Sequence, residues 1–296
     1  MLLLACSLAT ASPMATTGVP SQTFDTLFAA GSDLGLQPLA GRKALITGAS
    51  SGIGKATACA LAACGVDLIL VARREARLVE IADEIARRDL GVDVTMLVGD
   101  VAADEELYAK LDQIAASEGA PDIVIANAGG ALGKANVGEE ELSDVRTMMD
   151  VNVFGAIRTV RTLLPSMLAN QKGHVMFIGS IAGLEAYEGG SSYCAAKAAI
   201  HAFAKALRYE TYGSGVRVTN VAPGFVGEGT EFAAVRMKGD DTKAAATYAG
   251  FDELRATDIA CQLLWALRQP DRVNVDLLHV MPSSQGGATR IKRVLK

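Results

Sequence analysis

Short apolar runs alternate with longer amphipathic segments along most of the chain, from Gly41 to its end. The apolar runs are nearly continuous in Val, Ile and Leu instead of alternating between apolar and polar residues. Continuous runs of this kind are typical of parallel strands that are covered on both faces. The runs predicted to be strands are Lys43–Thr47, Val66–Ala72, Val92–Gly99, Asp122–Asn127, His174–Gly179, Val216–Val221 and, with a weaker pattern, Val275–Met281.

The segments between these runs have the apolar spacing of helices. The predicted helices are Gly54–Ala63, Glu75–Arg88, Asp104–Ala116, Leu142–Asn170, Ser192–Tyr212 and Thr257–Arg268. A regular alternation of strand and helix implies right-handed crossovers and a parallel sheet with helices on both faces. The pattern therefore predicts an α/β fold with a doubly wound parallel sheet of about seven strands. Because no repeat or linker interrupts the alternation, residues 43–296 are expected to form a single domain.

The first 42 residues do not share this pattern. The opening MLLLACSLATAS is similar to a secretory signal, but no Lys or Arg precedes Arg42. The positively charged start of such signals is therefore missing. We expect residues 1–42 to form a poorly ordered N-terminal extension without a role in transport. An alternative is that translation starts at Met14.

Composition and charge narrow the class of protein. Half of the 296 residues are hydrophobic and only 5% are aromatic, which fits helices packed on a parallel sheet. The formal net charge of −5 leaves no large basic surface, so a nucleic-acid partner is not expected. No apolar run reaches the roughly 18–20 residues that span a bilayer, so no membrane association is expected.

The five cysteines are scattered and contain no CxxC pair, and the three histidines lie far apart. This arrangement predicts neither a disulfide framework nor a metal site. Reduced thiols are the simplest interpretation, and they favour a cytoplasmic location.

A glycine-rich turn, TGASSGIG over residues 47–54, follows the first predicted strand and opens the first predicted helix. Glycines let the backbone approach a pyrophosphate closely, and the helix N-terminus offers free N–H groups and a positive dipole end. In this strand–turn–helix context the turn predicts nucleotide binding. The residues expected to contact the nucleotide here are Gly48, Ser50, Ser51, Gly52, Ile53 and Gly54.

The end of the second strand indicates which dinucleotide is bound. An NAD site usually has Asp or Glu here to accept a hydrogen bond from the ribose 2′-hydroxyl. This chain has Ala72 followed by Arg73 and Arg74. A carboxylate would repel the 2′-phosphate of NADP, whereas a guanidinium binds it through charge-assisted hydrogen bonds. The two arginines therefore predict NADP; the alternative is a solvated basic pair that opens the next helix.

Ser180, Tyr193 and Lys197 form a candidate catalytic set. The i,i+4 spacing of Tyr193 and Lys197 places the phenol and the ammonium on the same face of a predicted helix. A tyrosine with a pKa near 10 is poorly matched to proton transfer at neutral pH, and a nearby cation is expected to lower that pKa. Ser180 ends the fifth predicted strand, where its hydroxyl can hydrogen-bond a substrate oxygen.

In this order TGASSGIG, Asn127-Ala128-Gly129, Asn152, Ser180, Tyr193-xxx-Lys197 and Pro223-Gly224 resemble the short-chain dehydrogenases/reductases, from about Lys43 to Met281. The resemblance implies a Rossmann-like fold and hydride transfer between NADP(H) and a small carbonyl or alcohol substrate. It implies that Ser180, Tyr193 and Lys197 are catalytic and that Asn152 holds a proton-relay water. The further cofactor contacts it implies are Asp100, Val101, Asn127, Ala128, Gly129, Tyr193, Lys197, Pro223, Gly224 and Val226.

A closer resemblance is to the NADP-dependent 3-hydroxy acid dehydrogenases, including the serine/allo-threonine dehydrogenases. The matching stretches are residues 67–75, Gly229–Phe232 with Val235-Arg236, Lys238–Asp241, Val273–Val275 and Met281-Pro282. The resemblance implies a 3-hydroxy acid or its semialdehyde as substrate.

Two features of the chain depart from that group. The stretch Val226–Thr230 is one residue longer than the group leads us to expect, and the N-terminal extension is foreign to it. Two alternatives therefore stay open: an NADPH-dependent carbonyl or 3-oxoacyl reductase, and a non-catalytic NADP(H)-sensing binding protein.

Arg236 and Lys238 follow the loop that should cover the nicotinamide. One hypothesis is that one of them binds the substrate carboxylate, because a charged substrate needs a cation in a partly desolvated pocket. The competing and favoured interpretation is that both pair on the surface with Glu231, Asp240 or Asp241.

The family resemblance also suggests a homodimer or homotetramer. The helices Leu142–Asn170 and Ser192–Tyr212 are the expected contact elements, and the small residues of Ser192–Tyr212 would allow close packing between subunits.

Overall fold

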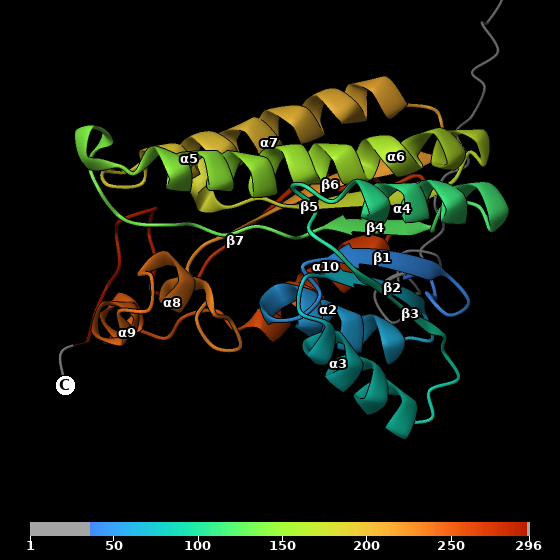
Figure 1. Cartoon of the computed structure of the whole chain (residues 1–296), viewed down its shortest axis with the longest axis horizontal. Helices are drawn as coiled ribbons and strands as arrows, with labels where there is room; N and C mark the ends of the chain where they lie inside the picture. The colour runs from blue at the N-terminus through green and yellow to red at the C-terminus, as the bar shows by residue number, and fades with distance from the viewer. Residues whose placement is uncertain (1–35, 295–296) are drawn as a thin grey trace, which may run out of the picture. The chain divides into compact units, whose positions relative to one another are not determined.

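A parallel seven-stranded sheet forms the centre of the computed structural model, which describes residues 36–294 (Figure 1). Its strands are β1 (Lys43–Thr47), β2 (Asp67–Ala72), β3 (Val94–Val98), β4 (Ile123–Ala126), β5 (Gly173–Ile178), β6 (Val216–Pro223) and β7 (Leu277–Val280). The strand order is β3-β2-β1-β4-β5-β6-β7, so the chain winds outward from the centre in both directions. The predicted doubly wound sheet is confirmed.

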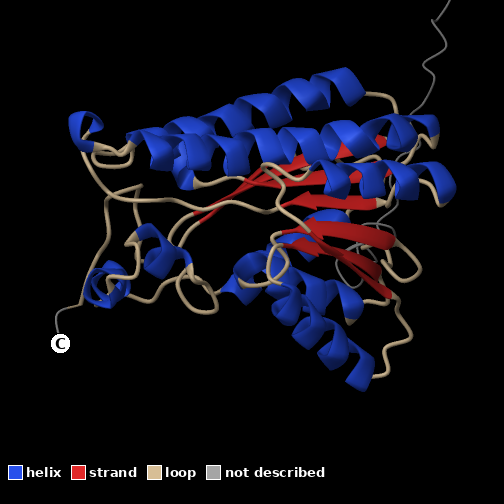
Figure 2. Cartoon of the chain, in the orientation of Figure 1, coloured by secondary structure: helices blue, strands red, loops and turns tan. Residues whose placement is uncertain are grey.

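Helices cover both faces of the sheet, as Figure 2 shows. One layer contains α2 (Gly52–Ala62), α3 (Glu75–Arg87) and α10 (Ala256–Leu267). The opposite layer contains α4 (Glu105–Ser117), α5 (Leu142–Met149), α6 (Ala156–Ala169) and α7 (Ser191–Thr211). Each layer buries its own apolar cluster against the sheet, one around Leu61 and Ile259 and the other around Leu111 and Leu163.

The single helix predicted over Leu142–Asn170 is wrong in its middle. A π-helical segment, η2 (Asp150–Gly155), separates α5 from α6. Within it, Nδ2 of Asn152 donates to the carbonyl oxygen of Met148 at 2.8 Å. A short polar side chain that bonds the backbone four residues earlier competes with the regular helical ladder, which explains the wider turn.

The two strands at the ends of the sheet are less covered than the sequence predicted. Met96 and Val98 in β3 are 39% and 42% exposed, and Leu277 in β7 is 42% exposed. Both strands lie at an edge of the sheet, so each has a neighbouring strand on one side only. Continuous apolar composition therefore predicts burial correctly only for the inner strands.

Residues 37–42 pack with the domain that follows them. Leu39 is buried in the core, and the backbone N–H of Gln37 donates to the carbonyl oxygen of Arg268 at 2.6 Å. The predictions for the rest of the N-terminal extension, including a start at Met14, lie outside the described residues. No helix in residues 36–294 is both long and apolar enough to cross a membrane.

Three further elements sit at the carboxyl ends of the strands. The short helix η3 (Ile181–Gly183) follows β5, while α8 (Phe232–Arg236) and α9 (Asp241–Tyr248) follow β6. The sequence analysis did not predict α8 or α9, because neither is long enough for apolar periodicity to identify it. In a doubly wound sheet, ligands bind outside the carboxyl ends of the strands, where the winding direction reverses. Here that point lies between β1 and β4.

Candidate active site

A pocket of about 1090 Å³ lies at the carboxyl ends of the strands. This volume is slightly above the usual range of about 300–1,000 Å³ for small-molecule sites. The predicted cofactor residues that line it are Gly48, Ser50, Ser51, Gly52, Ile53, Arg73, Arg74, Asp100, Val101, Asn127, Ala128, Gly129, Tyr193, Lys197, Pro223, Gly224 and Val226. Gly54 is the exception. The fold therefore brings residues from both halves of the sheet to one site.

The glycine-rich turn between β1 and α2 is tied to the end of β4. Gly48 has a φ of +66°, and a Cβ at this position would lie 2.8 Å from Cα of Ala128. A side chain on Gly54 would overlap the carbonyl oxygen of Gly48, so the absence of one lets the helix start pack against the turn. Nδ2 of Asn127 donates to the carbonyl oxygens of Thr47 and Gly48 at 2.8 and 3.2 Å. The turn thus has a fixed shape that presents the N-terminus of α2 to an anion.

Arg73 and Arg74 lie at the rim of the pocket and make different contacts. Arg74 donates from Nη2 to Oγ of Ser51 and from Nη1 to Oε2 of Glu231, both at 2.8 Å. The side chain of Arg73 is 72% exposed, and its Nη1 lies 3.5 Å from Oδ2 of Asp100. Two guanidinium groups therefore stand at the end of β2, where a 2′-phosphate would need charge-assisted hydrogen bonds.

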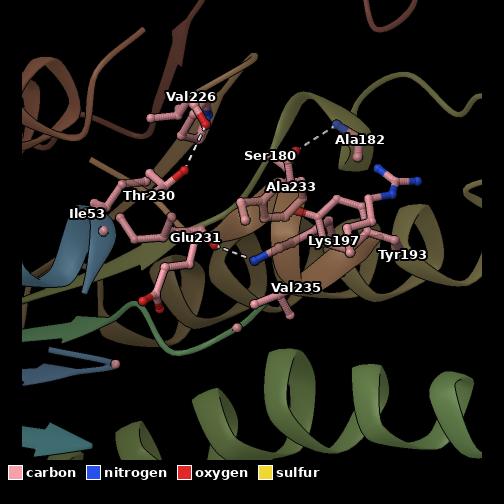
Figure 3. A pocket seen from close by; sticks show the side chains of 18 of the residues that line it. Ile53, Ser180, Ala182, Tyr193, Lys197, Val226, Thr230, Glu231, Ala233 and Val235 are labelled. Carbon is pink, nitrogen blue, oxygen red and sulfur yellow. Dashed lines mark hydrogen bonds between the residues drawn. The ribbon is translucent and has the colours of Figure 1, made fainter. Parts of the chain in front are cut away.

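Ser180, Tyr193 and Lys197 meet at the other end of the pocket (Figure 3). Ser180 precedes η3, and its Oγ accepts a hydrogen bond from the backbone N–H of Ala182 at 3.1 Å. Tyr193 and Lys197 lie one turn apart on α7, with Nζ of Lys197 5.8 Å from the centroid of the Tyr193 ring. Nζ of Lys197 also donates to the carbonyl oxygen of Ile178 at 2.8 Å. All three side chains are more than nine-tenths buried.

The prediction that Lys197 lowers the pKa of Tyr193 is wrong, because the effect of burial on that pKa is larger. Burial raises the pKa of Tyr193 above its ordinary value, and the hydrogen bond with Ser180 only partly opposes this rise. Burial also lowers the pKa of Lys197, to about 8. The ammonium is bonded to Ile178 and not to the phenol, so desolvation outweighs the attraction between the two groups.

Asn152 lies behind the pocket and not in its wall. Its Nδ2 donates to the carbonyl oxygens of Gly130 and Met148, and its Oδ1 accepts from the N–H of Gly130. A Cβ on Gly129 would collide with Oδ1 of Asn152 and lie 3.4 Å from Nζ of Lys197. Asn152 therefore fixes the backbone between itself and Lys197, and its predicted hold on a relay water stays a prediction.

Arg236 lines the pocket beside Tyr193, and the predicted pairing with Glu231, Asp240 or Asp241 is wrong for it. Among residues 36–294 its guanidinium has no carboxylate within ion-pair distance. Its donors instead reach the hydroxyl of Tyr187 at 2.8 Å and the carbonyl oxygen of Gly133 at 3.2 Å. Its Cζ lies 5.8 Å from the centroid of the Tyr193 ring.

The predicted pairing with Glu231, Asp240 or Asp241 is wrong for Lys238 as well. Its Nζ pairs with Oδ2 of Asp144 in α5 at 2.6 Å. Of the two cations that follow the loop, only Arg236 lacks a carboxylate partner among the described residues.

The sequence analysis did not identify two aromatic residues of this site, Tyr187 and Phe232. Both line the pocket, and the Phe232 ring packs 5.8 Å from that of Tyr193. A Cβ on Gly190 would collide with the Tyr187 ring, so the glycine makes room for it. An aromatic residue followed closely by two glycines, Gly189 and Gly190, was the available sequence signal for Tyr187.

A family model of the short chain dehydrogenases matches residues 42–240. With this match and the site described above, the chain belongs to the short-chain dehydrogenase family and is an oxidoreductase, as the motifs predicted.

It matches several relatives over nearly their whole length. It is 40% identical over 256 residues to the NADP-dependent 3-hydroxy acid dehydrogenase of Schizosaccharomyces pombe, covering 86% of this chain and 98% of that protein. It is 38% identical over 244 residues to the enzyme of that name in Salmonella typhi, covering 82% and 96%. A solved serine dehydrogenase, in its closed form with NADP⁺, matches with a TM-score of 0.76 and 35% identity over 86% of this chain and 99% of that one. The closer resemblance seen in the sequence is therefore confirmed.

Proposed function

We propose that this protein is an NADP-dependent dehydrogenase that interconverts a short 3-hydroxy acid and the corresponding semialdehyde or ketone. The observation that carries this proposal is the position of Arg236, a half-buried cation without a carboxylate partner in the described chain, beside the Tyr193 ring. A carboxylate held there by two charge-assisted hydrogen bonds would place a hydroxyl two carbons away near Tyr193 and Ser180. The relatives named as 3-hydroxy acid dehydrogenases support the same substrate class.

NADP is the cofactor because the end of β2 offers two guanidinium groups and no carboxylate side chain. Arg73 and Arg74 bind the 2′-phosphate, while the N-terminus of α2 binds the pyrophosphate. The NADP-dependent relatives and the NADP⁺ complex of the serine dehydrogenase support this choice. When bound, NADP⁺ accepts a hydride from the hydroxyl-bearing carbon, and NADPH returns it in the reverse direction.

The protein residues hold the substrate and move the proton. Tyr193 removes the hydroxyl proton during oxidation and returns it during reduction, as a general base and acid. Ser180 hydrogen-bonds the same substrate oxygen and orients it. Lys197, one turn from Tyr193 on α7, holds the nicotinamide ribose, and Asn152 supports a water that links Lys197 to solvent.

We also propose that the enzyme is a cytoplasmic homodimer or homotetramer. Ala195 and Ala198 are exposed on α7, and Phe154, in the segment between α5 and α6, is 59% exposed. Small and apolar exposed residues on adjacent helices suit a subunit contact. The free cysteines among the described residues, Cys59, Cys64, Cys194 and Cys261, suit a reducing compartment.

The experiment that tests the function is a substrate panel. The purified protein is mixed with NADP⁺ or NAD⁺ and with L-serine, L-allo-threonine, 3-hydroxypropionate or 3-hydroxyisobutyrate, and reduced cofactor is followed by absorbance. We expect turnover of at least one acid with a strong preference for NADP⁺. No turnover with any of the four acids would contradict the substrate class. Equal rates with both cofactors would contradict the role of Arg73 and Arg74.

A further inference from the structure

The segment that leads from β6 into α8 meets the glycine-rich turn directly at Gly52 and indirectly through Arg74. A Cβ on Gly52 would lie 3.7 Å from Cγ2 of Thr230, and Nη1 of Arg74 donates to Oε2 of Glu231 at 2.8 Å. The other side of the same guanidinium donates to Oγ of Ser50 and Ser51, at 3.1 and 2.8 Å from Nη2. Arg74 therefore links the glycine-rich turn to the start of α8.

Helix α8 is held at both of its ends. Glu231 is the residue at its N-terminus, and the carbonyl oxygen of Glu231 accepts from the N–H of Val235 at 3.0 Å. Arg236 is the last residue of α8, and its side chain is bonded to Tyr187 and Gly133. At about 1.5 Å per residue the helix is only about 7.5 Å long, so a displacement at one end moves the other. Figure 3 shows Glu231, Ala233 and Val235 along this side of the pocket.

We propose that Glu231 is a positioning residue that couples the cofactor-phosphate end of the pocket to the substrate end. Its ion pair with Arg74 fixes α8, and α8 in turn fixes where Arg236 meets a substrate carboxylate. The same negative charge stands beside the arginine that receives the 2′-phosphate, so Glu231 also weakens the binding of NADP relative to NAD. This inference rests on the proposed function of Arg74 and Arg236.

The donors of Arg74 allow both contacts at once. A guanidinium has five N–H donors in a planar fork. The Nη1 side of Arg74 faces Glu231, while the Nε and Nη2 side faces the serine hydroxyls. Those hydroxyls can rotate and donate to a phosphate instead of accepting from Arg74. The phosphate can then accept from Nε and Nη2 of Arg74 while Glu231 still accepts from Nη1. Glu231 is then a carboxylate close to a second anion, and like charges repel.

Two variants of Glu231 separate its charge from its hydrogen bond. Glu231→Gln removes the charge but keeps an oxygen that Arg74 can bond, whereas Glu231→Ala removes both. The matched control is Glu228→Ala in the same segment, because Glu228 pairs with Arg255 at 3.0 Å and not with Arg74. Thermal unfolding establishes that each variant is folded.

The first readout is cofactor binding, measured by calorimetry without substrate. Both Glu231 variants should bind NADP⁺ about two- to fivefold more tightly than the unmodified protein, a range set by exposed charge pairs, with NAD⁺ unchanged. Glu228→Ala should leave both dissociation constants unchanged. Unchanged NADP⁺ binding in Glu231→Gln, or an equal gain for NAD⁺, would overturn the proposed repulsion.

The second readout is the KM for 3-hydroxyisobutyrate at saturating NADP⁺. Glu231→Ala should raise this KM about fivefold with little change in kcat, while Glu231→Gln should stay within about twofold. In an Arg236→Ala background, Glu231→Ala should have no further effect, because the contact that it positions is gone. Effects that multiply fully in the double variant would overturn the coupling. Turnover of hydroxy acids by the unmodified enzyme is a separate test of the proposed function, and its failure would not be confused with failure of the coupling.

Discussion

The ammonium of Lys197 lies 2.8 Å from the carbonyl oxygen of Ile178, at the end of β5. This is the one hydrogen bond that the Lys197 side chain makes within residues 36–294, and the residue is only 4% exposed. A buried cation with a single neutral partner costs free energy, which is why burial lowers its pKa to about 8. The chain therefore holds Lys197 in a position that destabilises the fold and serves the site.

Replacing Lys197 with Met should stabilise the protein without cofactor and abolish turnover. The gain should be at most about 3 kcal/mol at neutral pH, at about 1.4 kcal/mol per pKa unit. In the folded protein the pKa is about 8, below the ordinary 10.5, so the penalty is fully present below pH 8. Between pH 8 and 10.5 the folded protein loses this proton and the penalty disappears, so the gain should shrink across that window.

Urea unfolding at several pH values checks this prediction. Lys205→Met is the matched control, because Lys205 lies on the same helix but is exposed and paired with Asp276. A gain that does not change with pH, or an equal gain in the control, would contradict the account.

Replacing Tyr193 with Phe should lower kcat by about 10²- to 10⁴-fold, the usual contribution of a general acid or base. Affinity for NADP⁺ should stay within about twofold, because only the hydroxyl is removed. Tyr209→Phe is the control, since Tyr209 is 60% exposed on the same helix. Steady-state turnover with calorimetric binding measures both quantities, and normal turnover in Tyr193→Phe would remove Tyr193 from the mechanism.

Replacing Arg73 or Arg74 with Ala should raise the KM for NADP⁺ at least about tenfold, since a hydrogen bond to a charged group contributes about 1.5–3 kcal/mol. The KM for NAD⁺ should hardly change, because NAD⁺ lacks the 2′-phosphate. Arg77→Ala tests for a general effect of surface charge, as Arg77 lies in the first turn of α3 and pairs with Glu80. An equal rise in KM for both cofactors would show that the arginines do not bind the 2′-phosphate.

The sequence predicted what depends on local pattern. The sheet, both helix layers and the meeting of the glycine-rich turn with Ser180, Tyr193 and Lys197 follow from apolar runs and from motifs at strand ends. The predicted order of strands and helices was enough to bring these motifs to one edge of the sheet.

The sequence did not predict what depends on contacts distant along the chain. Arg236 bonds to Gly133 and Tyr187, which are 103 and 49 positions away. No local sequence pattern predicts such a contact. The raised pKa of Tyr193 could not be predicted either, because the spacing of Tyr193 and Lys197 shows their proximity but not their burial. The π-helical segment at Asn152 likewise depends on a single side-chain bond within an otherwise regular helical pattern.

The proposed function requires that a carboxylate binds at Arg236 while Tyr193 moves the proton. The measurement that tests it most directly is kcat/KM with NADP⁺ for 3-hydroxyisobutyrate against its methyl ester, which keeps the carbon skeleton and loses the charge. The comparison is repeated in Arg236→Ala and in Lys238→Ala, whose lysine pairs with Asp144.

We expect the unmodified enzyme and Lys238→Ala to prefer the acid at least about tenfold, as one charge-assisted hydrogen bond would require. Arg236→Ala should lose most of that preference while retaining its activity on the ester. An unmodified enzyme that uses the ester as well as the acid, or an Arg236→Ala variant that keeps the preference, would contradict the claim and point to a reductase of neutral carbonyl compounds.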